Sequence, residues 1–423
     1  MNKDNPVASF DFVLTDLSIY VVRNIKAIDT LPFGQTVNTL SNWISSRFAA
    51  KHRMHLSDYL KSIGCCTTKG FIDLTYGLSI VDTFWIKPED SLLVWNDVSL
   101  YRNDFDEVVQ HLAFDGTGLY GEQMSTTSPE FGTNGNFDKC WVRENNKIYM
   151  LKRGTSWASN GGLEPYCEVL ASQVFYKMHA GILYDLVQFR GYAASKCELF
   201  TSEDYQYVPI SAFPLVSKEL PDVLDFYNKT LGSDEALRKM LICDAITLNT
   251  DRHLGNFGFL CNTETNEIVK AAPGFDYNLS MMPYIVNDEF MNLDAVISKF
   301  TPWLGGDFIK VSKALLTSEI REDLLKLQGI ELQLDCDDNF TESRLHYMTD
   351  IVNQRIDKIL YNRVESYAPL KVEGISNLYK YRLQNGFTDD EKWYREEQPR
   401  LFKAFGCKHL DELEQEIVVL LKD

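Results

Sequence analysis

The sequence predicts an α+β fold with two lobes, a β-rich upper lobe followed by a mainly helical lower lobe. Residues 139 to 200 alternate between apolar and polar side chains in short segments around one helical stretch, which is typical of a small sheet. After Pro221 the apolar residues recur mostly at helical spacing. A chain of 423 residues is too long for one hydrophobic core, so we expect separate packed units with a cleft between them.

The upper lobe is predicted to hold four strands and one helix. Asn145 lies in a polar turn, Glu144 to Asn146, that joins the first two strands into a hairpin. The helix runs from Pro165 to His179, with proline in its first turn, and Gly181 is expected to terminate it. The four strands, predicted from alternation and from their aromatic and β-branched residues, are 139 to 143, 147 to 152, 183 to 192 and 195 to 200.

The rest of the chain is expected to be mainly helical. One helix is predicted near the start, from Thr36 to Phe48. The lower lobe has six predicted helices, at 235 to 248, 307 to 328, 341 to 366, 371 to 385, 389 to 405 and 409 to 422. The expected domains are an N-terminal accessory region, an upper lobe and a lower lobe, at 1–115, 116–215 and 216–423.

Composition and charge exclude several classes of protein. The formal net charge of −18 disfavours direct binding to nucleic acid, because the phosphate backbone would be repelled. No signal peptide or long apolar span is recognisable, so no membrane binding is expected. The nine cysteines are an odd number and form no C-x-x-C pair, which favours reduced thiols and a cytoplasmic protein.

The segment from Asn249 to Asn256 carries the strongest chemical signal. Asp251 precedes Asn256 by five residues, the spacing of the catalytic base and a metal ligand in protein kinases. Asp276, 20 residues after Asn256, supplies a carboxylate for Mg²⁺, a cation that takes few protein ligands. Alone, Asp251 and Asn256 fit a capped turn equally well. His253 between them and Asp276 downstream favour phosphoryl transfer.

Lys152 is the predicted phosphate-binding cation, because a lysine at the end of an apolar strand needs a charged partner. Glu168, in the following helix, occupies the position from which a kinase carboxylate pairs with that lysine. Glu164 is a rival for this role. The alternative is that Lys152 reaches solvent at a strand end and that Glu168 lies in a solvated first turn.

Two segments could form the loop that covers the nucleotide phosphates. Both fall in or next to a stretch from Asp115 to Asn136 that is rich in glycine and small polar residues. Gly116 to Gly121 matches G-x-G-x-x-G, but no strand clearly follows it. The segment after it is preferred because it leads directly into the hairpin; its residues are Thr133, Asn134, Gly135, Asn136 and Lys139.

These motifs resemble the HipA-like kinases, bacterial proteins with a kinase-type fold of two lobes. The match is best from Ser128 to Ser280. The resemblance implies that Asp251 is the base, that Asn256 and Asp276 bind Mg²⁺, and that Lys152 binds phosphate. It further implies that the loop around Gly135 covers ATP and that His253 supports the catalytic loop or contacts phosphate. Adenine is expected against the backbone at Glu198 to Phe200.

Two features qualify the resemblance. Asp276 is followed by Tyr277 and Asn278, so the glycine of the kinase D-F-G motif is absent. HipA-like proteins can phosphorylate a serine in the phosphate loop, and the nearest serines here are Ser125 and Ser128.

The function predicted is ATP- and Mg²⁺-dependent phosphorylation of protein Ser or Thr hydroxyls, the chain itself included. An antitoxin-like protein partner is also considered. The alternatives are a small-molecule or lipid kinase on the same fold, and a non-catalytic binding module of the toxin–antitoxin type.

Overall fold

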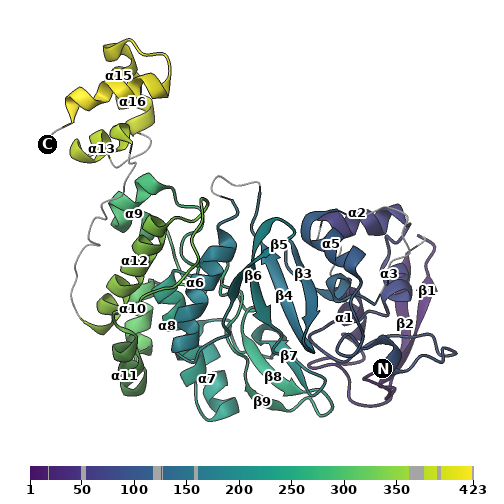
Figure 1. Cartoon of the computed structure of the whole chain (residues 1–423). Coiled ribbons are helices and arrows are strands. Elements are labelled where there is room, and N and C mark those ends of the chain that lie inside the picture. Colours follow the sequence, from purple (N-terminus) through teal and green to yellow (C-terminus); the bar gives the residue numbers. More distant parts are fainter. Residues whose placement is uncertain are drawn as a thin grey trace.

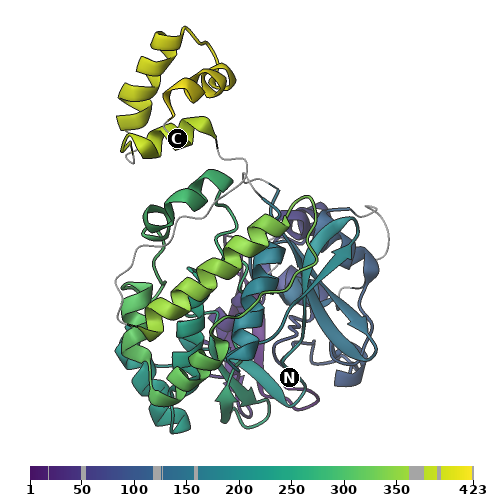
Figure 2. The same ribbon diagram turned by 60° about the vertical axis from the view of Figure 1, so that its left-hand side comes forward.

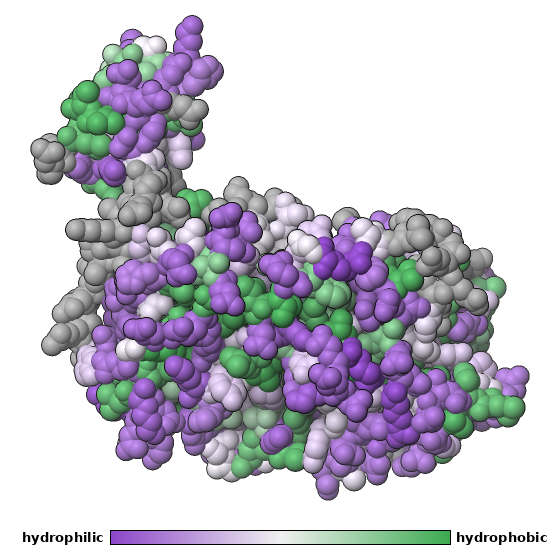
Figure 3. Space-filling view, in the orientation of Figure 1, coloured by the Kyte–Doolittle hydropathy of each residue, from purple (hydrophilic) through white to green (hydrophobic). Residues whose placement is uncertain are grey.

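The computed structural model describes residues 1–17, 19–48, 54–117, 125, 127–156, 161–361, 376–387 and 392–421. Within these ranges short sheets and many helices alternate along the chain, and the predicted α+β fold class is confirmed (Figure 1). Hydrophilic side chains cover much of the face drawn in Figure 3, with smaller hydrophobic patches between them. Among the described residues, no helix combines the length and apolar character that crossing a bilayer requires.

The N-terminal region has a hydrophobic core of its own. Leu56, Phe71 and Val109 are fully buried in it, and Phe131 from the segment before the four-stranded sheet joins them. A second cluster brings Trp85 and Trp95 together with residues of that sheet, so the region packs directly against the sheet. Its elements are β1 (Ala8–Leu14), β2 (Tyr20–Ala27), α1 (Leu40–Ser46), α2 (Met54–Ser62), α3 (Thr68–Thr75), α4 (Trp95–Val98) and α5 (Glu107–Asp115).

A four-stranded antiparallel sheet follows, with the strand order β3-β4-β6-β5. The predicted hairpin is present, and its turn places Asn145 and Asn146 in the left-handed region at φ 49° and 62°, which asparagine tolerates well. The strands are β3 (Lys139–Glu144), β4 (Lys147–Arg153), β5 (Asp185–Phe189) and β6 (Tyr192–Glu198). β5 ends earlier and β6 begins earlier than predicted, because Arg190 and Gly191 form a turn with positive φ between them.

Helices cover both faces of this sheet. Leu151 packs with Phe114 of α5, whereas the next residue, Lys152, reaches Glu168 of α6 (Glu164–Lys177). Successive residues of a strand point to opposite faces, so β4 presents an apolar side chain to one helix and a charged one to the other. The sequence prediction of α6 was correct, but its end was wrong: the residue with positive φ after the helix is His179, at 53°, and not Gly181.

The sequence did not predict the third sheet. Its antiparallel strands, in the order β7-β8-β9, are β7 (Tyr205–Pro209), β8 (Gly258–Asn262) and β9 (Ile268–Ala271). Phe257 to Cys261 is wholly buried, so it lacks the alternation that marks a half-exposed strand. This sheet flanks the segment from Asn249 to Asn256, and β8 begins two residues after Asn256.

The lower part of the molecule is helical, as predicted. Helix α8 (Glu235–Thr247) lies at its centre, and α12 (Glu342–Leu360) runs lengthwise beside it (Figure 2). The expected single helix at 307 to 328 is instead two, because the chain turns at Leu316 and Thr317 and Thr317 caps the second one. The other helices are α7 (Leu220–Leu231), α9 (Leu293–Ile297), α10 (Phe308–Leu315) and α11 (Ser318–Leu327).

The C-terminal helices form a small cluster with a separate core of Tyr381, Trp393, Leu401, Leu413 and Ile417. The predicted helices there are shorter than expected where they are described, and their segments at 362–375 and 388–391 lie outside the described residues. The cluster consists of α13 (Asn377–Gln384), a π-helical turn (Trp393–Glu397), α15 (Gln398–Phe405), α16 (Leu410–Glu416) and a 3₁₀ turn (Ile417–Leu420).

Candidate active site

Two lysines and a serine form a row across the four-stranded sheet. Lys139 of β3 pairs with Lys152 of β4, and Lys152 pairs in turn with Ser195 of β6. Residues paired in this way share one face of a sheet and their side chains are neighbours. Lys139 is 7% exposed and Lys152 is 4% exposed, so two like charges lie next to each other away from bulk water. Such an arrangement is costly unless anions balance it.

Lys152 is held between two carboxylates. Its Nζ donates to Glu168 Oε1 at 2.9 Å and to Asp276 Oδ1 at 2.5 Å. Glu168 is fully buried, and its carboxylate also accepts from the Ser195 hydroxyl and from the backbone N–H of Tyr277, the latter at 3.1 Å. The carboxylate of α6 therefore joins two strands of the sheet to the segment that carries Asp276.

The charges in this group reinforce one another. Burial alone would raise the pKa of Asp276, but the positive charges of Lys152 and Lys139 outweigh it and lower that pKa to about 2. Burial disfavours the charged form of Lys152 and by itself would lower the pKa of this lysine. The negative charges of Asp276 and Glu168 outweigh burial and raise that pKa above the ordinary lysine value. Lys152 and Asp276 are therefore both ionised near neutral pH.

Glu164, the rival partner for Lys152, has a different role. Its Oε1 accepts from the Thr155 hydroxyl at 2.5 Å and from the Tyr284 hydroxyl at 2.9 Å. Its Oε2 accepts from the N–H of Gly162 at 2.9 Å. Glu164 thus binds Thr155 and Gly162, which lie between β4 and α6, and the partner of Lys152 on this helix is Glu168.

The segment with the predicted base begins where α8 ends. Leu248 takes the left-handed conformation at φ 58°, and Asn249 then accepts from the N–H of Asp251 at 3.1 Å through its side chain. Asp251 is partly buried, and burial is the main cause that raises the pKa of its carboxyl. The positive charge of His253 lowers this pKa, and the negative charge of Asp276 raises it further. A carboxylate with a raised pKa is a better proton acceptor, which suits a general base.

Arg252, which was not among the residues predicted from the sequence, joins this segment to its surroundings. Its guanidinium forms a fork on Asp244 of α8, with Nε 3.0 Å from Oδ2 and Nη2 2.9 Å from Oδ1. Its Nη1 donates to the carbonyl oxygens of Asn256 at 2.9 Å and Phe275 at 2.7 Å. The available signal was Asp244, a lone acid inside the apolar run Leu241 to Ile246, which implies a buried cationic partner.

The backbones at the two predicted metal ligands lie close together, because Nη1 of Arg252 donates both to the carbonyl of Asn256 and to that of Phe275, the residue before Asp276. Asn256 donates through its amide nitrogen to the carbonyl of Asp251 at 3.0 Å, which leaves its amide oxygen for a cation. Within the described ranges no three His, Cys, Asp or Glu side chains gather as a metal cage. One carboxylate and one amide oxygen fit Mg²⁺, which keeps water and substrate oxygens as its other ligands.

The residue after Asp276 is firmly packed. Asp276 has φ 60°, a left-handed conformation, and its N–H is donated to the Tyr184 hydroxyl at 3.3 Å. Tyr277 is fully buried, stacks on Phe175 with 4.2 Å between ring centroids, and donates its hydroxyl to the carbonyl of Gly274. The conformation of Asp276 is thus fixed by the packing and hydrogen bonds on both sides of it.

The preferred phosphate loop lies beside the two lysines. Lys139 donates to the carbonyl of Asn134 at 2.6 Å, and Gly135 has φ 98° with its α-carbon facing the Lys139 amine. Thr133 accepts from the Trp141 indole at 2.8 Å, which anchors the start of the loop, while Asn134, Gly135 and Asn136 are exposed. The competing motif from Gly116 to Gly121 lies mostly outside the described residues, and Gly116 itself terminates α5.

His253 and the proposed adenine-binding residues lie at the margins. His253 accepts from the N–H of Gly255 through Nδ1 at 3.0 Å, and its ring stands 6.4 Å from that of Trp303. Phe200 packs on Phe275 with 5.2 Å between ring centroids, which brings it next to the Asp276 segment. Glu198 is exposed and pairs with Lys147 at 2.7 Å, so its side chain is not part of the charged group around Lys152.

The two serines near the loop differ in exposure. Ser128 is 2% exposed and donates its hydroxyl to the carbonyl of Ser125 at 3.2 Å. Ser125 is exposed. Of the two serines, Ser125 is therefore the accessible one.

Comparison with known proteins gives likenesses of structure only. No family model matches the chain, and no curated protein sequence matches it. One similar solved structure is the proinflammatory kinase CtkA of Helicobacter pylori, at 17% identity and a TM-score of 0.41, over 54% of this chain and 90% of that chain. Another is HipA of Shewanella oneidensis MR-1 in a toxin–antitoxin complex with HipB and operator DNA. It has 13% identity and a TM-score of 0.47, over 85% of this chain and 96% of that chain.

Proposed function

We propose that this protein is an ATP- and Mg²⁺-dependent kinase that phosphorylates Ser or Thr hydroxyls of proteins, itself included. The observation that carries the proposal is the pair of buried lysines on neighbouring strands, Lys139 and Lys152, opposite the segment of Asp276. Two lysines at such positions repel each other; Glu168 and Asp276 bind Lys152, and the charge of Lys139 also acts on Asp276. A polyphosphate would bind favourably beside two neighbouring positive charges.

The acidic residues nearby suit two further requirements of phosphoryl transfer, a proton acceptor and ligands for a metal ion. Asp251 would accept the proton of the attacking hydroxyl, whose oxygen forms a bond to the γ-phosphorus while the bond to the ADP oxygen breaks. The raised pKa of Asp251 and the lowered pKa of Asp276 separate a proton acceptor from a permanently charged carboxylate. Asn256 and Asp276 would hold Mg²⁺, which neutralises phosphate charge when bound.

We assign a different proposed role to each of the three predicted regions. Residues 116–215 would hold the nucleotide through Thr133, Asn134, Gly135, Asn136 and Lys139, and residues 216–423 would supply the base and metal ligands. Residues 1–115 would brace the nucleotide-binding sheet, as the packing of Trp85 and Trp95 against it supports. Adenine binding at Glu198 to Phe200 and an antitoxin-like partner stay predictions.

Incubation with radiolabelled ATP and Mg²⁺ tests the proposal. The wild-type chain should incorporate label into protein, and Asp251→Ala and Asp276→Ala should each lower the rate by at least about 100-fold. Asp350→Ala is the matched control, because Asp350 lies on α12 and pairs with His346 at 3.5 Å. That variant should label as the wild type does.

The same assay separates the alternatives. Labelling that survives in both Asp251→Ala and Asp276→Ala would refute the proposed site. ATP consumption that needs an added metabolite or lipid and leaves the protein unlabelled would instead favour a small-molecule or lipid kinase. Mapping the label would show whether Ser125 is an acceptor, and Ser125→Ala should then remove it.

A further inference from the structure

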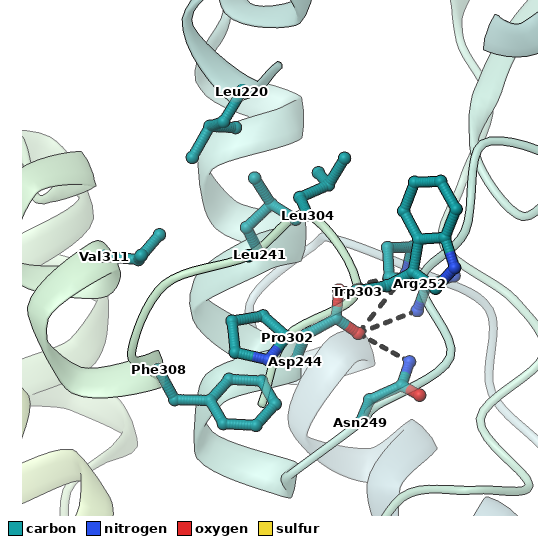
Figure 4. A pocket seen from close by; sticks show the side chains of 11 residues that line it. Leu220, Leu241, Asp244, Asn249, Arg252, Pro302, Trp303, Leu304, Phe308 and Val311 are labelled. Carbon is teal, nitrogen blue, oxygen red and sulfur yellow. Dashed lines mark hydrogen bonds and ion pairs between the residues drawn. The ribbon is translucent and has the colours of Figure 1, made fainter. Parts of the chain in front are cut away.

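Asp244 and Arg252 form a buried ion pair directly behind the predicted catalytic loop. Both side chains are 2% exposed, and the fork of the guanidinium lies on the carboxylate with two short contacts. Asn249 adds a third donor to Asp244 at 2.7 Å (Figure 4). Because α8 carries Asp244, the loop from Asn249 to Asn256 is anchored to the central helix of the lower lobe.

Arg252 has a second set of contacts on the other side of its guanidinium. Nη1 donates to the carbonyls of Asn256 and Phe275, and these residues are separated by 19 positions in the sequence. Asn256 is itself a proposed metal ligand, and Phe275 immediately precedes Asp276. One nitrogen therefore fixes the distance between the backbones that carry the two proposed ligands.

The surroundings of the pair strengthen these bonds. Figure 4 shows the pair in a pocket whose walls come from α7, α8, α10 and the segment after Thr301. Nearly all of these walls are apolar: Leu220, Leu241, Pro302, Trp303, Leu304, Phe308 and Val311. Apolar walls reduce the polarisability around the pair, and hydrogen bonds to charged groups are stronger there than in water.

We propose that Arg252 is a positioning residue that sets the spacing of Asn256 and Asp276, and through it the affinity of the site for the divalent cation. The inference rests on the proposed function, since it concerns the same metal ligands. Arg252 does not touch the reacting groups; it acts through the backbone of the two ligands. Supporting residues of this kind change metal affinity or activity by about 10-fold to 100-fold when replaced.

Lysine cannot replace this arginine. Its single ammonium can keep the charge beside Asp244, but it cannot also donate to two carbonyls on the far side of a rigid fork. In Arg252→Lys the ion pair would persist while the constraint between Asn256 and Phe275 is lost. The variant therefore separates a role in folding from a role in positioning.

Arg355→Lys is a matched control. Arg355 of α12 is also an almost fully buried arginine, at 1% exposure. It donates through Nε, at 2.5 Å, to the carbonyl of Ala245 on α8, the helix that carries Asp244. Its hydrogen bond to Ala245 and its position over the Phe308 ring do not involve the predicted loop or the Asp276 segment. Losing this arginine should cost stability without changing cation binding.

The experiment measures Mn²⁺ binding by electron paramagnetic resonance, in the presence of a non-hydrolysable ATP analogue, for the wild type, Arg252→Lys and Arg355→Lys. Arg252→Lys should weaken Mn²⁺ binding about 10-fold or more and raise the Mg²⁺ concentration for half-maximal labelling by a similar factor. Arg355→Lys should leave both values within about twofold of wild type, even if its melting temperature falls as much as that of Arg252→Lys.

Each outcome has one meaning. If Arg252→Lys binds Mn²⁺ as tightly as the wild type, the positioning role is wrong while the proposed function stands. If both lysine variants weaken Mn²⁺ binding equally, the effect is general loss of structure and the inference is also wrong. If the wild type binds no Mn²⁺ with the analogue, the proposed function itself fails.

Discussion

Among the described residues, two buried ion pairs, Lys152 with Glu168 and Arg252 with Asp244, lie near the predicted catalytic loop, and they differ in what surrounds them. The upper pair, Lys152 with Glu168, has a third member, Asp276, whose side chain is 30% exposed. The lower pair, Arg252 with Asp244, is 2% exposed on both sides, and its further acceptors are backbone carbonyls. A charged ligand can therefore reach the upper pair, whereas the lower pair is closed, that is, inaccessible to solvent.

The choice of cation matches this difference. Lysine carries a compact charge on a flexible stem, which can turn from a carboxylate to a phosphate without rebuilding its surroundings. Arginine has a rigid fork with five donors, which suits a fixed junction of several chain segments. A buried ion pair alone therefore does not mark a site; the exposure and identity of its other partners do.

The largest effect is expected from breaking the lower pair. Asp244→Ala leaves the charge of Arg252 buried without its carboxylate, which should lower the free energy of unfolding by about 3–5 kcal/mol. Urea denaturation in the absence of nucleotide measures this loss. A loss below about 1 kcal/mol would mean that water or another acceptor takes the place of Asp244, and that the lower pair is not closed.

Breaking the upper pair should mainly affect the ligand. Lys152→Met removes the charge that faces Asp276 and the proposed phosphates, so the labelling rate should fall by about 100-fold or more. The stabilisation of the fold by ATP with Mg²⁺, measured as a rise in melting temperature, should disappear with it. Lys147→Met is the control on the same strand, because the Lys147 side chain is 55% exposed and pairs with Glu198. An equal loss in the control would contradict the special role of Lys152.

A smaller effect is expected from pH. The pKa of Asp276 in the folded protein, about 2, is below its unfolded value of about 3.9, so the ionised carboxylate stabilises the fold. This contribution, about 2 kcal/mol before allowance for solvent screening, is present above about pH 4 and is lost as the pH falls toward 2. The difference in unfolding free energy between the wild type and Asp276→Asn should shrink over that interval. A constant difference would show that the neighbouring lysines do not lower the pKa of Asp276.

The sequence predicted the parts whose signals are local. The hairpin of β3 and β4 is encoded by alternation and by a turn at Asn145 and Asn146, and both are present. The pairing of Lys152 with Glu168 could be expected because a lysine in an apolar strand requires an acid nearby. For the same reason Asp244 could have indicated its buried partner, but only the fold identifies that partner as Arg252.

Other features depend on contacts between distant segments. The strand β8 is buried on both faces, so its sequence has no alternation to distinguish it from a buried helix. The pairing of Lys139 with Lys152 follows from the register of two strands, and a shift of one residue would move one of them to the other face. The break between α10 and α11 depends on the cap at Thr317, which the continuous helical periodicity of the sequence conceals.

The packing of Tyr277 has a consequence for inhibitor design. An inhibitor that gains affinity by displacing an aromatic ring next to a metal-binding aspartate needs that ring to leave its pocket. Here the ring would have to abandon its stacking on Phe175 and its hydrogen bond to Gly274, and expose a fully buried tyrosine. Compounds that occupy the open side of Asp276 therefore offer better starting points than compounds that require the aromatic pocket to empty.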